Sequence, residues 1–118
     1  MPSHEKINYL EFPVKDLEAT KKFFSDVFQW SFEDFGPEYC AFSNAGMDGG
    51  FYQSDLNSLT TNGAALIVFY SEALEETEVK IKKSGGQIIK EIFTFPGGRR
   101  FHFSDPNGNE FAVWSDKA

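Results

Sequence analysis

The sequence predicts an α+β fold in which one domain, residues 1–118, contains two copies of a strand–helix–strand–strand–strand module. Three observations support this prediction. The length of 118 residues suits a single domain. Apolar residues in each half recur first with a period of two and then at helical spacing. Side chains of the two halves also match at offsets of 57 to 60 residues. We place module 1 at about 5–53, a polar connector at 54–62 and module 2 at about 63–115.

The first module begins with alternating residues at 7–14, which predict a strand. Asp16 follows as a helix N-cap, since its side chain can accept the free N–H groups of the first turn. Apolar residues spaced by three and four along 16–29 predict an amphipathic helix. We expect Gly49 and Gly50 to interrupt the pattern before the last strand. The other strands are expected at 30–35, 39–44 and 51–53.

The second module repeats this order. Residues 64–70 read as a strand, and Ser71 is a candidate helix cap. Helical spacing runs from Leu74 to Ile81 and stops before Gly85, which is typical of a helix C-terminus. The remaining strands are expected at 87–93, 99–103 and 110–114.

Matching positions in the two halves support a duplication. The matched pairs are Phe12 with Phe69, Leu17 with Leu74, Glu18 with Glu75 and Thr20 with Thr77, each 57 residues apart. Near the end of the modules the offset grows to 60, where Phe51 matches Phe111. A loop of slightly different length in the second half explains this growth.

A tight turn is predicted before the last strand. Pro106 fixes φ for the second turn position, Asp105 can bond its own backbone, and Gly108 tolerates positive φ. From Glu110 to Trp114 the residues alternate again, so the turn leads directly into a strand with two unlike faces.

The composition limits the classes of partner and the cellular location that we expect. The net charge of −7 and the pI of about 4.7 argue against nucleic acid and anionic membrane as partners. No apolar run approaches the roughly 20 residues of a spanning helix, and the first residues do not resemble a signal peptide. We therefore expect a cytoplasmic protein. Cys40 is the single cysteine, which excludes an internal disulfide, and we interpret it as a core residue.

Together, the two modules, the helix start at Asp16-Leu17-Glu18 and the run Asp105-Pro-Asn-Gly-Asn-Glu-Phe111 resemble the vicinal-oxygen-chelate superfamily. This group includes glyoxalase, bleomycin-resistance proteins and extradiol dioxygenases. The resemblance implies that eight strands form a cup-shaped mixed sheet with the helices outside. It also implies a small ligand in the cup and a homodimer.

Enzymes of that superfamily hold a divalent metal at four symmetric positions, in which His, Gln and carboxylate side chains are the ligands. The resemblance places these positions on Tyr9, Tyr52, Leu66 and Ala112. Leu66 and Ala112 have no donor atom, and a phenol is a poor ligand for a hard cation. We therefore expect no metal cofactor, although an unconventional divalent metal site stays open.

Strand alternation indicates what would line the cup instead. The candidate ligand-binding residues are Tyr9, Glu11, Tyr52, Leu66, Val68, Tyr70, Ala112 and Trp114. Aromatic and aliphatic walls with a few acids suit a small hydrophobic or aromatic ligand. The alternative is that these side chains only fill a core.

Two further alternatives concern charged residues. Glu11 and His102 are weak catalytic candidates, because together they would form an acid–base pair or an unusual metal site. A His flanked by phenylalanines is more often a satisfied core or surface residue. Arg99 and Arg100 suit a carboxylate or phosphate, or else pair with surface glutamates.

Three functions therefore remain open. The first is a small-molecule-binding protein that lacks the metal ligands of the family and sequesters or senses its ligand. The second is a metal-dependent lyase or dioxygenase. The third is an interaction module without a ligand.

Overall fold

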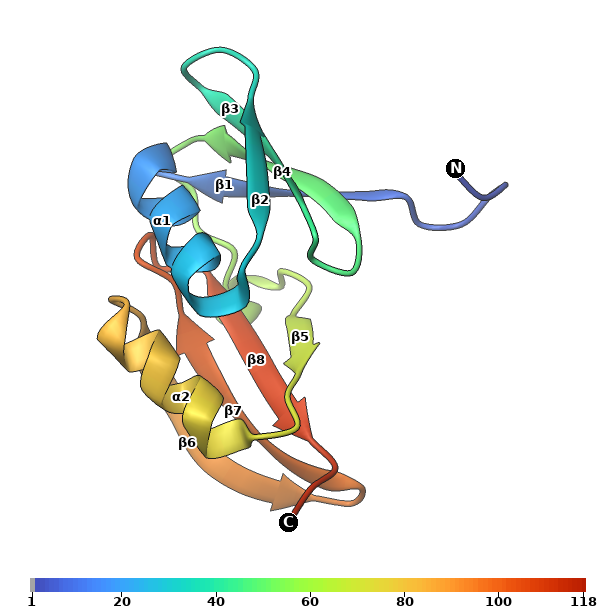
Figure 1. The fold of residues 1–118 in the computed structure, drawn as a ribbon, viewed down its shortest axis with the longest axis vertical. Helices are drawn as coiled ribbons and strands as arrows, with labels where there is room; N and C mark the ends of the chain where they lie inside the picture. Colours follow the sequence, from blue (N-terminus) through green and yellow to red (C-terminus); the bar gives the residue numbers. More distant parts are fainter. Residues whose placement is uncertain (1) are drawn as a thin grey trace. The chain divides into compact units, whose positions relative to one another are not determined.

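The computed structural model describes residues 2–118. The chain divides into two compact units, one ending at Leu56 and the other beginning at Asn57. Each unit contains one four-stranded mixed sheet and one α-helix, with strand orders β1-β4-β3-β2 and β5-β8-β7-β6 (Figure 1). In each sheet the first two strands in this order are parallel and the others antiparallel. The predicted α+β class with two βαβββ modules is confirmed.

The elements of the first unit are β1 (Tyr9–Val14), α1 (Leu17–Phe28), β2 (Ser31–Asp34), β3 (Tyr39–Ser43) and β4 (Asp48–Gln53). The second unit contains the short 3-10 helix η1 (Thr60–Asn62), β5 (Ile67–Tyr70), α2 (Leu74–Lys83), β6 (Gln87–Phe95), β7 (Gly98–Ser104) and β8 (Glu110–Ser115). None of the helices in residues 2–118 is long and apolar enough to span a membrane.

Helix α1 begins where the sequence predicts. Asp16 has an extended backbone, and its Oδ1 accepts the Ala19 N–H at 3.1 Å. The helix buries its apolar stripe against aromatic rings of the sheet, where Phe24 and Phe42 both stack on Trp30 with centroids 4.6 and 4.4 Å apart. Each buried Phe side chain contributes roughly 1.5–3 kcal/mol to folding.

The predicted interruption at Gly49 and Gly50 is wrong, because β4 runs through both residues. A Cβ atom at Gly50 would collide with the ring of Tyr39, and one at Gly49 with the ring of Phe42. The glycines therefore make room for aromatic rings of the neighbouring strand. Cys40, also on β3, is fully buried as expected, and burial raises the pKa of its thiol to about 11.

Helix α2 has no side-chain cap of the predicted kind. Ala73 occupies the N-cap position, and Ser71 lies two residues earlier. The Ser71 Oγ instead accepts the Ala73 N–H at 3.0 Å and shares a 2.7 Å hydrogen bond with the Thr77 hydroxyl. Ser71 therefore stabilises the helix start as an ST-turn.

Part of the predicted connector is anchored within the second unit. The Ser58 N–H donates to Asn109 Oδ1 at 2.8 Å, and the Glu110 N–H donates to the Ser58 carbonyl at 2.9 Å. Asn57 donates to the Asn107 carbonyl at 3.2 Å. Residues 57–60 are therefore held along the start of β8 and do not behave as a free linker.

The predicted turn between β7 and β8 is organised by Asp105. Its Oδ1 accepts the N–H groups of Asn107 and Asn109 at 3.0 and 2.9 Å, and the Gly108 N–H donates to its carbonyl. Gly108 adopts φ of 93°, a conformation that favours glycine. Burial raises the pKa of the Asp105 carboxyl, although these hydrogen bonds act in the opposite direction.

Replacing Asp105 tests this organisation. Asp105→Ala should lower the free energy of unfolding by about 2–4 kcal/mol, since each buried donor that loses its acceptor costs roughly 1–3 kcal/mol. Asp105→Asn keeps an acceptor oxygen and should lose clearly less. Urea denaturation of both variants measures the difference, and equal losses would contradict the account.

Candidate functional site

Strand β7 presents its side chains alternately to the two faces of its sheet. Phe101 and Phe103 are fully buried core residues, whereas Arg100 and His102 point to the opposite face. We call this opposite face the His102 face. His102 lies directly opposite Ala112, and Arg100 directly opposite Trp114. The strand residues that form the His102 face are Val68, Tyr70, Lys90, Phe93, Phe95, Arg100, His102, Glu110, Ala112 and Trp114.

A buried pair of titratable side chains lies on this face. His102 is 5% exposed, and its Nδ1 lies 2.9 Å from Glu110 Oε2. The other carboxylate oxygen, Oε1, accepts both the N–H and the hydroxyl of Thr60, at 2.9 and 2.8 Å. The two donors of Thr60 and the contact with His102 therefore fix the carboxylate, which in turn fixes the imidazole ring.

The Glu110 carboxyl is held in its ionised form. Burial acts to raise its pKa, but the hydrogen bonds from His102 and Thr60 outweigh burial and leave the pKa below its ordinary value of 4.5. An ionised carboxylate has no hydrogen to donate, so Nδ1 of His102 carries the hydrogen of the shared bond.

Two buried nitrogens on the same face have no hydrogen-bond partner among residues 2–118. These are His102 Nε2 and Arg100 Nε. The two residues are two positions apart on β7, and therefore neighbours on one face. Native proteins seldom leave buried polar atoms unpaired, so each of these atoms calls for an explanation, such as a catalytic role or a bound water or ion.

Aromatic rings surround these nitrogens. The Phe93 ring lies 6.1 Å from the His102 ring and 5.5 Å from the Arg100 guanidinium. Phe95 lies 6.3 Å from Trp114, which meets Tyr70 edge-on at 5.2 Å. An aromatic strip therefore crosses the sheet from β6 to β5.

The two adjacent arginines have different surroundings. Arg99 forms a bidentate ion pair with Glu75 of α2, with N–O distances of 2.5 and 3.2 Å. This is the pairing with a surface glutamate that the sequence left open. Arg100 points to the His102 face and forms no ion pair with the described residues. Only Arg100 therefore stays available for an anion.

In the first unit, the predicted residues Tyr9 and Glu11 meet through a third side chain. The Tyr39 hydroxyl donates to Glu11 Oε2 at 2.8 Å and lies 2.6 Å from the Tyr9 hydroxyl. Tyr52 lies directly opposite Tyr39 in the sheet. Burial, followed by these hydrogen bonds, raises the pKa of Tyr39. Tyr39 therefore bridges Tyr9 and Glu11, and Glu11 itself is exposed.

The predicted residues of the second unit group differently. Val68 and His102 flank Ala112 on the two neighbouring strands, and Tyr70 pairs with Trp114. Leu66 is half-buried just before β5. His102 is hydrogen-bonded to Glu110, and Glu11 to Tyr39, so each member of the predicted acid–base pair has a partner within its own unit. That prediction stays untested.

Sequence reasoning missed the roles of Glu110, Thr60 and Tyr39. Glu110 was identified from the sequence only as the first residue of the alternating last strand. Alternation also places His102 opposite Ala112 once the hairpin around the Asp105 turn is assumed, so this signal was present in the sequence. Thr60 lies in the supposed connector and gave no signal.

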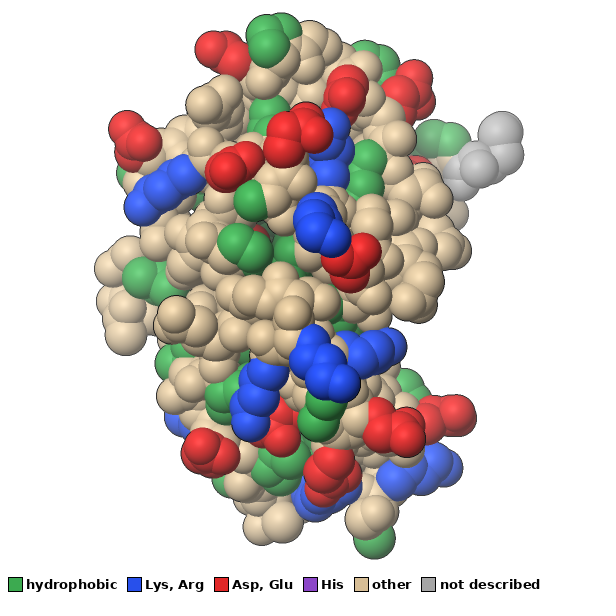
Figure 2. All heavy atoms as spheres, turned by 60° about the vertical axis from the view of Figure 1, so that its left-hand side comes forward, with side chains coloured by type: hydrophobic (Ala, Val, Ile, Leu, Met, Phe, Trp, Pro, Cys, Tyr) green, Lys and Arg blue, Asp and Glu red, His purple; other side chains and the backbone are tan. Residues whose placement is uncertain are grey.

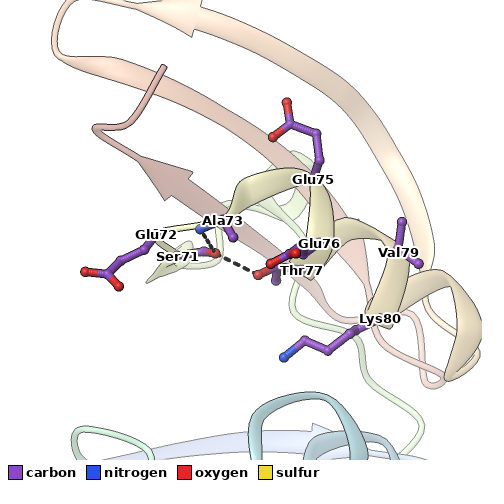
Figure 3. A pocket seen from close by; sticks show the side chains of 8 residues that line it. All are labelled: Ser71, Glu72, Ala73, Glu75, Glu76, Thr77, Val79 and Lys80. Carbon is purple, nitrogen blue, oxygen red and sulfur yellow. Dashed lines mark hydrogen bonds between the residues drawn. The ribbon is translucent and has the colours of Figure 1, made fainter.

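A cavity of about 690 Å³ beside α2 is a weaker candidate. Figure 3 shows its side chains diverging, with Glu72, Glu75 and Lys80 pointing in different directions. A ligand site needs polar groups that converge. A second cavity, of about 460 Å³, lies in the first unit beside Tyr9 and Phe35 and carries the acids Glu33 and Asp48.

Surface charge offers no extended basic area on the face that Figure 2 draws. Lys and Arg side chains there lie next to Asp and Glu side chains, with hydrophobic side chains between them. The expectation from net charge that nucleic acid is not a partner stays a prediction.

The residues present do not fit a divalent metal of the kind the resemblance implies. Residues 2–118 contain no group of three or more His, Cys, Asp or Glu side chains that could hold a metal ion. On the His102 face, only the imidazole and the carboxylate of Glu110 offer suitable donors, and these are bonded to each other.

The low pKa of Glu110 predicts a pH dependence of stability. A carboxylate whose pKa is lowered by folding stabilises the fold fully above its ordinary pKa of 4.5, and this contribution is lost as pH falls through the folded-state value. The wild type should therefore lose more stability than Glu110→Gln when the pH falls from neutral to well below 4.5. Denaturation at both pH values measures this difference.

The exposed Glu91 on β6 provides a matched control. Glu91→Gln should follow the wild-type pH dependence. A Glu110→Gln variant with the same pH dependence as the wild type would contradict the proposed state of the carboxyl.

Solved structures with the same fold were found. A glyoxalase-related enzyme from Fulvimarina pelagi shares 19% identity, with a TM-score of 0.74 and coverage of 94% of this chain and 88% of that chain. The fosfomycin resistance protein FosX from Listeria monocytogenes shares 21% identity, with a TM-score of 0.78 and coverage of 98% of this chain and 94% of that chain. Lactoylglutathione lyase from Agrobacterium tumefaciens shares 16% identity, with a TM-score of 0.70 and coverage of 96% of this chain and 95% of that chain. At these identities the likeness shows the fold alone.

The curated proteins contain no match to this chain. The sequence model of a family described as the Glyoxalase/Bleomycin resistance protein/Dioxygenase superfamily matches residues 6–113. This match covers most of the chain and confirms the resemblance drawn from the repeated modules and the Asp105 turn. The chain therefore belongs to the Glyoxalase/Bleomycin resistance protein/Dioxygenase superfamily.

Proposed function

We propose that this protein binds a small, partly aromatic molecule on the His102 face without a divalent metal, in a sequestering or sensing role. The observation that carries the proposal is the pair of buried, unpartnered nitrogens, His102 Nε2 and Arg100 Nε, among aromatic rings. A few converging polar groups in apolar surroundings are typical of small-molecule sites.

The side chains of the four family positions support binding without a metal. Leu66 and Ala112 contribute no donor atom, and Tyr9 shares its hydroxyl with Tyr39. One solved relative, a FosX mutant from Listeria monocytogenes, is described in complex with Mn(II) and 1S,2S-dihydroxypropylphosphonic acid. The donor set at the four positions of this chain favours a different use of the fold.

Metal titration tests this part of the proposal. Calorimetric titration of the purified protein with Mn²⁺, Ni²⁺ and Zn²⁺ should give only the weak, unsaturable binding expected of exposed acidic side chains. Tight binding of one equivalent would contradict the proposal and favour the metal-dependent lyase or dioxygenase. Loss of such binding in His102→Ala would place that metal on the His102 face.

Ligand screening tests the other part. In the presence of EDTA, a bound aromatic compound should raise the melting temperature, because a ligand at 100 times its Kd stabilises the native state by roughly 2.7 kcal/mol. Trp114→Ala should reduce this ligand-induced shift, since it removes a ring of the aromatic strip.

Phe35→Ala is the matched control for that screen. Phe35 is an exposed aromatic residue of the first unit, far from β8 in the sequence. Its removal should leave the ligand-induced shift unchanged. A screen in which both variants respond alike would contradict binding at the His102 face. The predicted homodimer stays a prediction, which light scattering can check.

A further inference from the structure

The hydrogen bond between Glu110 and His102 decides what the imidazole can do for a ligand. Because Nδ1 donates to the carboxylate, the neutral imidazole presents a lone pair at Nε2. The carboxylate also stabilises the imidazolium that forms when Nε2 takes up a proton. Nε2 is therefore a base that has no partner among residues 2–118.

A compensating cation lies beside this base. Arg100 is the next residue of β7 on the same face, and its Nε–H is buried without an acceptor. An oxyanion close to both groups would accept hydrogen bonds from Arg100 and from the protonated His102. Such charge-assisted bonds are shorter and stronger than those between neutral groups.

We propose that His102, oriented by Glu110 and Thr60, accepts the proton of an acidic hydroxyl on an aromatic ligand, and that Arg100 binds the resulting oxyanion. The ligand O–H bond breaks, its electron pair stays on oxygen, and an N–H bond forms at Nε2. The step needs no oxidant or reductant. This inference rests on the proposed function and names its ligand class as phenols and related hydroxyl acids.

The charged groups on the His102 face favour this step. Glu110 from β8 stabilises the imidazolium, whereas Arg100 from β7 and Lys90 from β6 favour the oxyanion. Lys90 lies directly opposite His102, with its Nζ 5.3 Å from the centroid of the Phe93 ring.

The probe 4-nitrophenol tests the inference, because its phenol and phenolate forms absorb at different wavelengths. At a pH below the pKa of the free probe, the wild-type protein should bind it and convert the bound fraction to phenolate. Nitrobenzene, which has a similar ring and no hydroxyl, should bind at least about tenfold more weakly.

Glu110→Gln reverses the orienting hydrogen bond. The amide oxygen keeps both bonds from Thr60, while the amide N–H donates to Nδ1 and moves the imidazole hydrogen to Nε2. This variant should form at least about tenfold less bound phenolate, a change of one pKa unit in the bound probe. Glu91→Gln should behave like the wild type. If Glu110→Gln fails to fold, Thr60→Ala removes one orienting bond and should give a smaller loss in the same direction.

The outcomes separate this inference from the proposed function. A bound probe that keeps its phenol spectrum, or equal phenolate in wild type and Glu110→Gln, would overturn the proton transfer. If nitrobenzene and 4-nitrophenol then bind with equal affinity, the proposed function stands without the proton transfer. If neither compound binds, both the inference and aromatic ligand binding at this face are contradicted.

Discussion

The buried carboxylate of Asp105 is the constraint on which the second unit depends. It collects the N–H groups of the turn between β7 and β8, and so sets the register of that hairpin. This register places His102 opposite Ala112 and brings Glu110 within hydrogen-bond distance of the imidazole. The same turn anchors residues 57–60, through Asn109 and the backbone of Glu110, so that Thr60 reaches the carboxylate.

Sequence alone predicted the repeated modules well, because turn chemistry and periodicity are local. The Asp16 cap, the helical stripe and the Asp105 turn each depend on residues a few positions apart. The prediction for Gly50 was wrong because its role is not local. Its role depends on the ring of Tyr39, which lies eleven residues earlier on the neighbouring strand, and no local pattern records that contact.

The candidate site was predicted only in part. Alternation identified the faces that carry Tyr9, Glu11, Val68, Tyr70, Ala112 and Trp114. It also separates His102 from its neighbours Phe101 and Phe103, which point to the other face. Hydrogen-bond partners were beyond this reasoning, because the N–H and the hydroxyl of Thr60 contact Glu110 across fifty residues, and no local pattern records such a contact. Arg99 and Arg100 differ in their surroundings because Arg99 alone pairs with Glu75 on α2, and no pattern in the sequence indicates this pairing partner.

We infer that Glu110 keeps the imidazole hydrogen on Nδ1 and leaves Nε2 free for a ligand. Long-range ¹H–¹⁵N NMR distinguishes the two imidazole tautomers by their nitrogen shifts. The sequence contains two histidines, so a His4→Gln variant assigns the His102 signals. At neutral pH we expect the Nδ1–H form in the wild type and the Nε2–H form in Glu110→Gln. A wild-type spectrum of the Nε2–H form would contradict this inference.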